Sequence, residues 1–411
     1  MLKLANFCAA NSPQKEFACI QKSNNAMKKS FDFVVLGATG MQGRIVTRDL
    51  AENGYRVLMC GRDKKRIDHL LHNYKKTDFE YFDARNINRT ARIIKRAGAD
   101  VVVNCVEGDW NLNILKSCIK ANVNCLDLGS EIPMTQDQFA LHDKLKKKNL
   151  ISITGCGSVP GIGNVMLNHA AKKFDSLHSI EVGFAWNSNI KKFVVPFSIG
   201  SIIDEFTEPA TNVKEGKFVK TRPMDSLITT KEPFVGKEKC MYVRHPETYT
   251  FYHYFKNKGL KNVRFYAEFP PHSFDVIAKL IDLGLNSEKK ILVEGVHVTP
   301  LDVLTETLKD LKFPKGYKEK ENLWVRLYGA KNGERKTTLM ECIVNTNKGW
   351  EDAGCNIDTG MPASIMAQMV KEKIISEKGS FAPEAIVPPE LFFKELRKRK
   401  MVIYENGKRI N

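Results

Sequence analysis

The sequence has few of the features that would tie a chain to a membrane, a metal ion or a disulfide framework. It contains no run of about 18 apolar residues, the length that a membrane-spanning helix needs. Its 10 cysteines are scattered singly, and no Cys-x-x-Cys pair occurs. This usage is typical of a reducing compartment and argues against disulfides and a metal site. We therefore expect a cytoplasmic protein with no membrane segment and no bound metal.

Acidic residues are in the minority, because 47 Asp and Glu stand against 64 Lys and Arg, for a formal net charge of +17. The basic residues are spread along the chain, and the only dense block, from Lys394 to Lys400, is typical of a solvated helix end. A nucleic-acid surface needs interleaved aromatic residues and a recognisable module. We therefore expect no nucleic-acid partner. A basic surface instead attracts anionic cofactors and carboxylate substrates.

The first 30 residues lack the periodicity of a helix or a strand. Their apolar stretch, from Leu4 to Ala10, is too short for a secretory signal, and they contain none of the arginines typical of a mitochondrial transit peptide. Met27 stands just before the first predicted strand. We expect residues 1–30 to be a disordered extension or the product of a misassigned start codon.

The most informative stretch runs from Phe31 to Gly43 and reads FDFVVLGATGMQG. An apolar strand leads into three glycines spaced three apart, and a helical pattern follows, as in the opening of a dinucleotide-binding unit. Gly37 permits a sharp turn, and Gly40 lets the backbone approach a pyrophosphate. Gly43 lets the helix pack closely on the strand. The free N–H groups of the helix then face the phosphates.

Strands and helices alternate regularly over residues 31–160. Six strand–helix repeats predict an α/β domain with a Rossmann-type, doubly wound parallel sheet. Val101–Asn104 is nearly all valine, as a strand buried on both faces should be. The predicted strands are 33–36, 56–60, 79–82, 101–104, 124–128 and 151–154, and the later helices are 64–74, 87–97, 112–121 and 136–148.

The rhythm changes after residue 160, and 411 residues leave room for a second domain. Strand-like runs at 179–184, 262–269 and 291–293 follow without helices in strict alternation. The runs 324–330 and 336–344 flank Lys331-Asn332-Gly333, a hairpin signal. We expect a mixed α+β, largely antiparallel domain over residues 161–358 that binds substrate, with dimerisation as a second candidate role.

The last segment, residues 359–411, is expected to return to the first domain. A helix from Met361 to Ser376 has Pro362 in its predicted first turn. Its apolar face needs a partner after the mixed domain ends. We predict that this helix and the tail behind it pack on the dinucleotide-binding domain.

Ligands of doubly wound sheets bind beyond the carboxyl ends of the strands. The second strand ends in Gly61-Arg62, where an NAD enzyme would place an acidic residue for the ribose. A guanidinium there binds a 2′-phosphate bidentately, with Lys64 or Lys65 adding charge, unless the loop is simply solvated. We therefore predict NADP rather than NAD. The predicted cofactor-binding residues are Gly37, Ala38, Thr39, Gly40, Met41, Gly43, Arg62, Asp83, Asn104, Cys105 and Val106.

A family resemblance rests on the glycine loop, on Gly61-Arg62, on Asp127-Leu128-Gly129 and especially on the run from Gly157 to Asn164, GSVPGIGN. In these stretches the chain resembles saccharopine dehydrogenase and its relatives. The last of these runs is similar to the family's glycine-rich turn between the last strand and the helix that enters the substrate domain. The resemblance spans roughly residues 31–400. Further family-like stretches are 196–198, 244–247 and 379–396.

The resemblance implies NAD(P)-dependent oxidation of an amine at carbon, run in either direction. Members act on saccharopine, lysine or carboxylated polyamines, so a small amino-acid substrate is expected. Glutamate-forming saccharopine dehydrogenase is closer at Gly61-Arg62, whereas lysine 6-dehydrogenase is closer in the C-terminal half, which leaves the substrate open. Family members are often dimers, so we also expect a homodimer.

Few residues are candidates for the chemistry. His245 titrates near neutral pH, and Pro246 stiffens its loop, so His245 is either a catalytic base or a structural histidine. Asp127, at a strand end, is a second candidate for the base, with helix capping or ribose binding as its other roles. Ser198 and Arg244 are candidates for binding a substrate carboxylate.

Two other functions fit parts of the sequence. Tyr254 and Lys258 have the Tyr-x-x-x-Lys spacing with which short-chain dehydrogenases activate an alcohol. The pair comes far beyond the glycine loop, beside Gly259 rather than within a helix. A non-enzymatic NADP-binding regulatory protein is the second alternative. The large second domain with its glycine-rich turn favours a substrate site over both.

Overall fold

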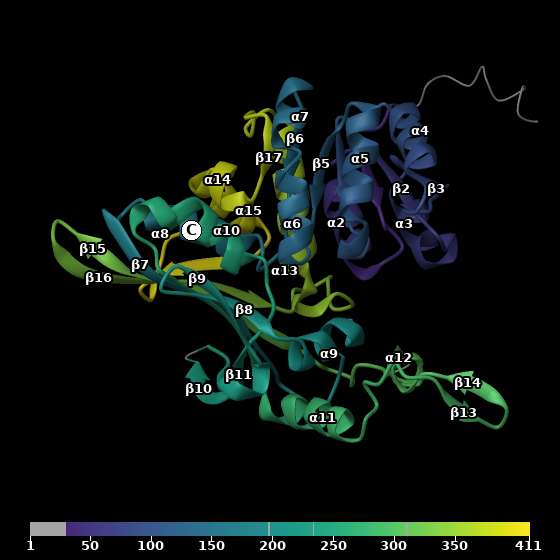
Figure 1. The fold of residues 1–411 in the computed structure, drawn as a ribbon. Coiled ribbons are helices and arrows are strands. Elements are labelled where there is room, and N and C mark those ends of the chain that lie inside the picture. The colour runs from purple at the N-terminus through teal and green to yellow at the C-terminus, as the bar shows by residue number, and fades with distance from the viewer. Residues whose placement is uncertain (1–29, 196–197, 233, 310) are drawn as a thin grey trace, which may run out of the picture.

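The computed structural model of the protein describes residues 30–195, 198–232, 234–309 and 311–411. The extension expected at residues 1–30 lies outside this part of the chain, apart from its last residue. Two large sheets organise the described chain (Figure 1).

The first sheet has seven parallel strands in the order β17-β6-β5-β4-β1-β2-β3. The chain runs outward from β1 to β3, crosses over to β4, and continues in the other direction. This is the doubly wound Rossmann-type sheet that the sequence predicts, and it confirms the first half of the expected fold class. Its strands are β1 (Phe33–Leu36), β2 (Val57–Gly61), β3 (Thr77–Tyr81), β4 (Val101–Asn104), β5 (Asn124–Asp127), β6 (Ile151–Ile153) and β17 (Gly379–Phe381).

Helices cover both faces of this sheet, so β1, β2 and β4 are fully buried. The prediction of one helix over 136–148 is wrong, because two shorter helices form and the first begins early, with Pro133 in its first turn. The helices are α2 (Met41–Glu52), α3 (Asp68–Asn73) behind the 3-10 turn η1 (Lys64–Ile67), α4 (Ile87–Ala97), α5 (Asn111–Ala121) behind η2 (Gly108–Trp110), α6 (Ile132–Phe139) and α7 (His142–Lys147).

The second sheet has ten strands, of which only β7 and β12 pair in parallel. This confirms the expected mixed, largely antiparallel domain. The predicted hairpin joins β15 and β16, and Asn332 and Gly333 both have positive φ, at 53° and 82°. The strands are β7 (Ser176–Ser188), β8 (Ala210–Lys214), β9 (Lys217–Thr221), β10 (Ile228–Glu232), β11 (Gly236–Tyr242), β12 (Asn262–Phe269), β15 (Glu319–Lys331), β16 (Glu334–Asn345), β18 (Val402–Glu405) and β19 (Lys408–Arg409).

The helix predicted from Met361 begins earlier, as α13 (Ile357–Lys371) behind η5 (Gly354–Asn356). Pro362 therefore lies inside the helix and not in its first turn. Because proline has no N–H, the backbone carbonyl of Asp358 lacks its helical partner.

The C-terminal segment contacts the first domain at several points. α13 packs on α2, and β17 extends the first sheet beside β6. Arg399 reaches Asp49 of α2 with two contacts, Nε–Oδ1 at 2.7 Å and Nη2–Oδ2 at 2.8 Å, and both side chains are buried. The helix behind the glycine loop is thus held by the end of the chain. The remaining helices of this part are α14 (Pro383–Ile386) and α15 (Pro389–Lys398).

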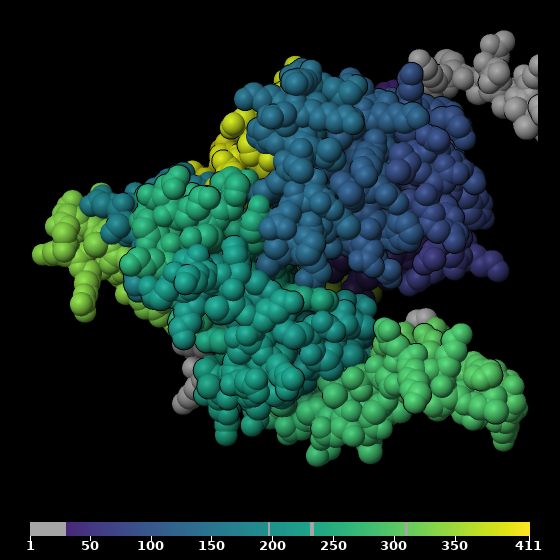
Figure 2. Space-filling view, in the orientation of Figure 1, coloured from purple at the N-terminus to yellow at the C-terminus, as the bar shows by residue number. Residues whose placement is uncertain are grey.

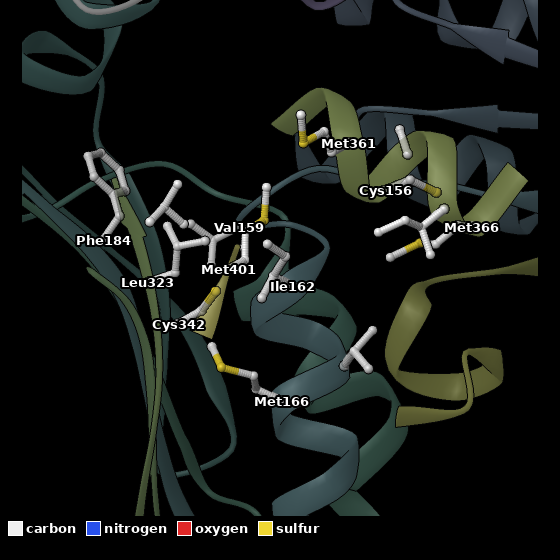
Figure 3. Packing of buried hydrophobic residues seen from close by; sticks show 14 of the residues in the cluster. Cys156, Val159, Ile162, Met166, Phe184, Leu323, Cys342, Met361, Met366 and Met401 are labelled. Atoms are coloured by element: carbon white, nitrogen blue, oxygen red, sulfur yellow. The ribbon is translucent and has the colours of Figure 1, made fainter. Parts of the chain in front are cut away.

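One hydrophobic core joins the two sheets. α8 (Ile162–Ala171) packs on the second sheet, and Figure 3 shows its Ile162 and Met166 in one cluster with residues of that sheet, such as Phe184 and Leu323, and with Met361 and Met366 of α13. The two domains therefore share a packed interface rather than a thin linker. Labelled members of this core are Cys156, Val159, Ile162, Met166, Phe184, Leu323, Cys342, Met361, Met366 and Met401.

A slender arm leaves the second domain (Figure 2). β13 (Ile291–Val293) and β14 (Val296–Val298) pair only with each other, and Leu292 and Val296 are 64% and 61% exposed. No helix in the described chain is long and apolar enough to span a membrane. The other helices are α9 (Ile199–Thr207), α10 (Glu247–Phe255), α11 (Pro271–Asp282) and α12 (Pro300–Lys309), with the short turns η3 (Pro223–Ser226) and η4 (Lys256–Lys258).

Candidate functional site

Two cavities open at the carboxyl ends of the parallel strands. The first, of about 600 Å³, lies over the glycine loop and the ends of β1 to β4, and we call it the glycine-loop cleft. The second, of about 270 Å³, lies at the ends of β5 and β6 against the second sheet, and we call it the acidic cavity. Both occupy the edge at which doubly wound sheets bind ligands.

The glycine loop has the close approaches that its three glycines predict. Gly37 has φ +79°, and a Cβ there would stand 2.7 Å from the Cys105 carbonyl oxygen. A Cβ on Gly43 would stand 2.2 Å from the Gly37 oxygen, so only glycine lets α2 pack this closely. At Gly40 a Cβ would meet only the Gly37 oxygen, at 3.3 Å, because this residue faces the open cleft.

The N-terminus of α2 is built to receive an anion. Gly40 is its N-cap, and no side chain caps the helix. The first N–H groups of this 12-residue helix therefore point toward the cleft without a side-chain acceptor, and the helix dipole adds positive potential. A pyrophosphate is the group that such a terminus binds.

Three arginines line the far end of the glycine-loop cleft: Arg62, Arg66 and Arg85. Arg85 pairs with Asp83 at 2.6 Å, and this pair, with Arg62 nearby, lowers the pKa of Asp83 to about 2. No carboxylate of the described residues pairs with Arg62 or Arg66, so both remain available for a phosphate. Arg66 thus lines the cleft together with Arg62, whereas Lys64 and Lys65 do not line it.

The structure separates the predicted cofactor-binding residues into two groups. Ala38 and Asn104 are buried behind the cleft, and Asn104 Nδ2 donates to Asn111 Oδ1 at 2.8 Å. Asn104 Oδ1 also accepts from the backbone N–H of Val106, so it holds the loop that the cleft uses. Those that line the cleft are Gly37, Thr39, Gly40, Arg62, Asp83, Cys105 and Val106, and those that do not are Ala38, Met41, Gly43 and Asn104.

The acidic cavity brings together segments that are far apart in the sequence. Four carboxyl groups line it. Among the described lining residues, His245 is the only basic side chain, because none is Lys or Arg. The family-like turn 157–160 forms one wall. The full lining is Gln42, Leu128, Gly157, Ser158, Val159, Pro160, Phe184, Trp186, Glu205, His245, Glu319, Glu321, Cys355, Asn356, Asp358 and Thr359.

Two contacts fix the orientation of the His245 ring. Its ring stacks on Phe265 with centroids 3.8 Å apart, and its Nδ1 lies 3.2 Å from Glu247 Oε2. Nε2 is therefore the ring nitrogen left for the cavity. Burial disfavours the charged ring, but the carboxylates of Glu247, Glu205 and Glu131 outweigh burial and raise the pKa of His245.

Glu205, on α9, is the acid that shares this end of the cavity. Burial raises the pKa of Glu205 to about 8, although His245 opposes the shift. Its Oε2 is buried and has no hydrogen-bond partner among the described residues. A carboxyl group that titrates near neutral pH beside an imidazole is suited to proton transfer. The sequence offered no local signal for it.

Asp127 lies behind both cavities and lines neither. Its Oδ1 accepts from Gly129 N–H at 2.8 Å, from Thr154 Oγ1 at 2.8 Å and from Gly155 N–H at 3.2 Å. Its Oδ2 accepts from Gln138 Nε2 at 2.6 Å. These bonds tie the ends of β5 and β6 together, so Asp127 shapes the rim of the site.

Arg244 and Ser198 also lie outside the two cavities. Arg244 contacts Glu131 of the first domain at 3.0 Å. It also contacts Asp204 of α9 and Glu208, the residue that caps the end of α9, at 3.6 Å each. Its charge is thus already balanced within the protein. Ser198 is exposed just before α9 and makes no capping bond.

Tyr254 and Lys258 are placed for structure. Tyr254 lies in α10, so its expected position outside a helix is wrong, and its hydroxyl accepts from Ala382 N–H at 3.3 Å. Lys258 Nζ donates to the carbonyl oxygens of Ala171 and Phe174. Neither residue lines the cleft or the cavity.

The sequence matches two family models in succession. Residues 33–153 match the saccharopine dehydrogenase NADP binding domain, and residues 157–402 match the saccharopine dehydrogenase C-terminal domain. The boundary between the matches falls at the start of the turn that lines the acidic cavity.

Two curated relatives are similar over most of their length. Carboxyaminopropylagmatine dehydrogenase of Synechocystis sp. is 22% identical over 378 residues, covering 88% of this chain and 94% of the relative. Carboxynorspermidine synthase of Vibrio alginolyticus is 23% identical over 341 residues, covering 79% and 82%. Apo saccharopine dehydrogenase (L-Glu forming) of Saccharomyces cerevisiae shares the fold, with a TM-score of 0.71, 15% identity and coverage of 93% and 100%.

Proposed function

Because the chain belongs to the saccharopine dehydrogenase family, an oxidoreductase family with an NADP-binding domain, we propose that it transfers hydride at a carbon–nitrogen bond. The donor or acceptor is NADP, and the substrate carbon is the amine or imine carbon of an amino acid. Among the family's substrates, we propose one that carries additional ammonium groups, as a carboxylated polyamine does. The reaction runs as reductive condensation or as its reverse.

The glycine-loop cleft fits NADP. The uncapped N-terminus of α2 and the open face of Gly40 would hold the pyrophosphate. Arg62 and Arg66 would hold the 2′-phosphate, because no carboxylate of the described residues pairs with them. When bound, the nicotinamide supplies or accepts the hydride.

The charge of the acidic cavity supports the polyamine class. Saccharopine carries three carboxylates, and the described lining offers no Lys or Arg to receive them. Four carboxyl groups instead favour a substrate with several positive charges. The names of the two curated relatives point to substrates of the same kind.

His245 and Glu205 are the groups we propose for proton transfer. Reductive condensation needs an acid to help water leave the carbinolamine, and amine oxidation needs a base to deprotonate the ammonium. His245 and Glu205 line the same cavity, where burial raises the pKa of Glu205 to about 8 and nearby carboxylates raise the pKa of His245. The apolar walls around them exclude water from the hydride step.

The observation that carries this proposal is an acidic cavity beside an NADP-binding cleft. The test follows the absorbance of reduced nicotinamide with a panel of substrates and both cofactors. The panel holds lysine, saccharopine, aminoadipate semialdehyde with glutamate, and an amino-acid semialdehyde with a diamine or a triamine. We expect turnover of NADPH with semialdehyde and polyamine; turnover confined to saccharopine would refute the proposed class.

We also propose that the active protein is a homodimer in the cytoplasm, as the family resemblance suggests. β13 and β14 form an exposed apolar hairpin. An isolated two-stranded hairpin is only marginally stable in water, so contact with a second copy of the chain would stabilise it. Light scattering of the purified protein that gives the mass of one chain would refute the dimer.

A further inference from the structure

Two carboxyl groups of the acidic cavity face each other across the domain boundary. Glu321 comes from β15 of the second sheet, and Asp358 comes from the first turn of α13. Alternation along β15 puts Glu319 and Glu321 on the same side of the strand, toward the cavity. The cavity therefore has a second acidic group besides Glu205.

This acidic group consists of Glu319, Glu321 and Asp358, and one of its atoms, Asp358 Oδ2, lacks a conventional hydrogen-bond donor among the described residues. Glu319 Oε2 accepts from Cys355 N–H at 2.8 Å, and its Oε1 accepts from Tyr317 Oη at 3.1 Å, so Glu319 is satisfied. Asp358 is 2% exposed, and its Oδ1 accepts from Thr359 Oγ1 at 3.1 Å. No N–H or alcohol hydroxyl of the described residues donates to Asp358 Oδ2, and Asp358 is hydrogen-bonded instead to the carboxyl group of Glu321. A buried carboxylate whose partner is a second carboxyl group suits a cationic ligand.

Glu321 and Asp358 together hold a proton when no cation is bound between them. Burial raises the pKa of Glu321 well above its usual range, and the adjacent Asp358 raises it further. Burial also raises the pKa of Asp358, while the bond from Glu321 opposes the shift. Two carboxyls in this arrangement titrate as a unit. The other titratable groups that face them are Glu205 from α9, Glu319 from β15, Cys342 from β16 and Cys355 from η5.

The wall beside the pair suits an organic cation. Trp186 of β7 is the cross-strand partner of Glu321, and Phe184 lies on the same face two residues away. An ammonium group gains from carboxylates and from aromatic faces at once. No three His, Cys, Asp or Glu side chains of the described chain are arranged to hold a metal ion.

We propose that Glu321 and Asp358 form an ammonium subsite, a proposal that rests on the proposed function. The terminal ammonium of a polyamine substrate takes the place of the proton that the pair otherwise shares. The carboxyl O–H bond breaks, the proton passes to water or buffer, and no other covalent bond changes. This subsite lies in the same cavity as His245 and Glu205, so it would hold the chain of the substrate while its reacting nitrogen is at the other end.

The test is calorimetric titration of the whole protein with spermidine, in two buffers of equal pH and different ionisation enthalpy. The difference between the buffers measures protons released. We expect release approaching about one proton per spermidine near neutral pH and affinity that rises with pH, because the pair must lose a proton to bind the cation. Glu321→Gln and Asp358→Asn should each weaken spermidine binding by about 10-fold to 100-fold and abolish the proton release.

Glu334→Gln, an exposed carboxylate in the same hairpin, is the matched control and should change neither quantity. Wild-type binding without proton release, or equal binding of Mg²⁺ and spermidine at the site, overturns the proposal even if a variant fails to fold. NADPH turnover that persists with no loss of polyamine affinity in Glu321→Gln refutes the subsite and leaves the proposed function standing. Spermidine binding with proton release but no turnover of NADPH refutes the proposed function and leaves the subsite.

Discussion

The two cavities at the edge of the parallel sheet differ in charge and in origin. The glycine-loop cleft has three arginines and an uncapped helix N-terminus, whereas the acidic cavity has four carboxyl groups. The cleft is formed largely by backbone at successive strand ends. The acidic cavity is formed by side chains from both sheets, α9 and α13. One edge of one sheet thus presents a basic cleft beside an acidic cavity.

The difference teaches why a strongly basic chain can have a substrate site of the opposite sign. A net charge of +17 describes the whole surface and predicts attraction of anions such as NADP. It does not describe a cavity of about 270 Å³, in which a few buried groups decide the local potential. The net charge therefore predicts attraction of an anionic cofactor, whereas the residues that line the acidic cavity decide which substrate charge it favours.

The largest expected effect separates chemistry from cofactor binding. His245→Asn removes the nitrogen proposed to exchange protons and should lower kcat by about two to four orders of magnitude. NADPH affinity, measured by quenching of protein fluorescence, should not change, because His245 lines only the acidic cavity. His297→Asn, on the exposed arm, serves as the control. A variant with near-normal kcat would make His245 a structural residue.

The second prediction concerns the contact between the end of the chain and α2. Arg399→Met leaves Asp49 buried without its cation, and removal of one partner of a buried pair costs about 3–5 kcal/mol. Urea unfolding should show this loss in the free energy of unfolding. Arg397→Met, exposed on the same helix, should cost little. Equal effects of the two substitutions would mean that the contact to α2 does not stabilise the fold.

The third prediction tests the basic end of the cleft. Arg62→Ala should raise the Michaelis constant for NADP by about one to two orders of magnitude, since a charge-assisted hydrogen bond contributes roughly 1.5–3 kcal/mol. The constant for NAD should change little. Lys64→Ala is the matched control, because Lys64 does not line the cleft. If both cofactors are affected equally, or wild type prefers NAD, Arg62 does not bind the 2′-phosphate.

The smallest effect concerns the pH profile of the acidic cavity. Glu205, with its pKa raised to about 8, is protonated at neutral pH and loses its proton as pH rises through that value. The condensation rate should therefore fall by up to about tenfold above pH 8, and Glu205→Gln should lack this limb. Glu208→Gln, on the same helix end, should keep it. A wild-type profile that is flat from pH 7 to pH 9 would contradict this role.

The sequence predicts the cleft better than the cavity for a physical reason. The roles of Gly37, Gly40 and Gly43 depend on neighbours within a few residues, so spacing alone reveals them. The same holds for elements with strong periodicity, such as α4 and β4, whose bounds match the prediction. Where a helix begins depends on weaker signals, and α13 begins before the residue predicted.

The acidic cavity depends on contacts between distant segments. Glu321 and Asp358 are brought together by β15 and α13, and neither residue stands in a local pattern that indicates burial. The sequence indicates His245 as a candidate because an imidazole titrates near neutral pH. It gives no such signal for Glu205, since a glutamate on an amphipathic helix is usually solvated. Asp127 and Arg244 show the opposite case, because their charges are used within the protein and not offered to a ligand.

The most direct test of the account measures kcat/KM against the number of charges on the amine. A single semialdehyde and NADPH are held constant while a monoamine, a diamine and a triamine of the same spacing are compared with glutamate. The account predicts that kcat/KM rises by about tenfold or more with each ammonium that reaches a carboxyl pair of the acidic cavity, and that glutamate ranks last. A series in which glutamate ranks first, or in which the added ammonium groups have no effect, would contradict it.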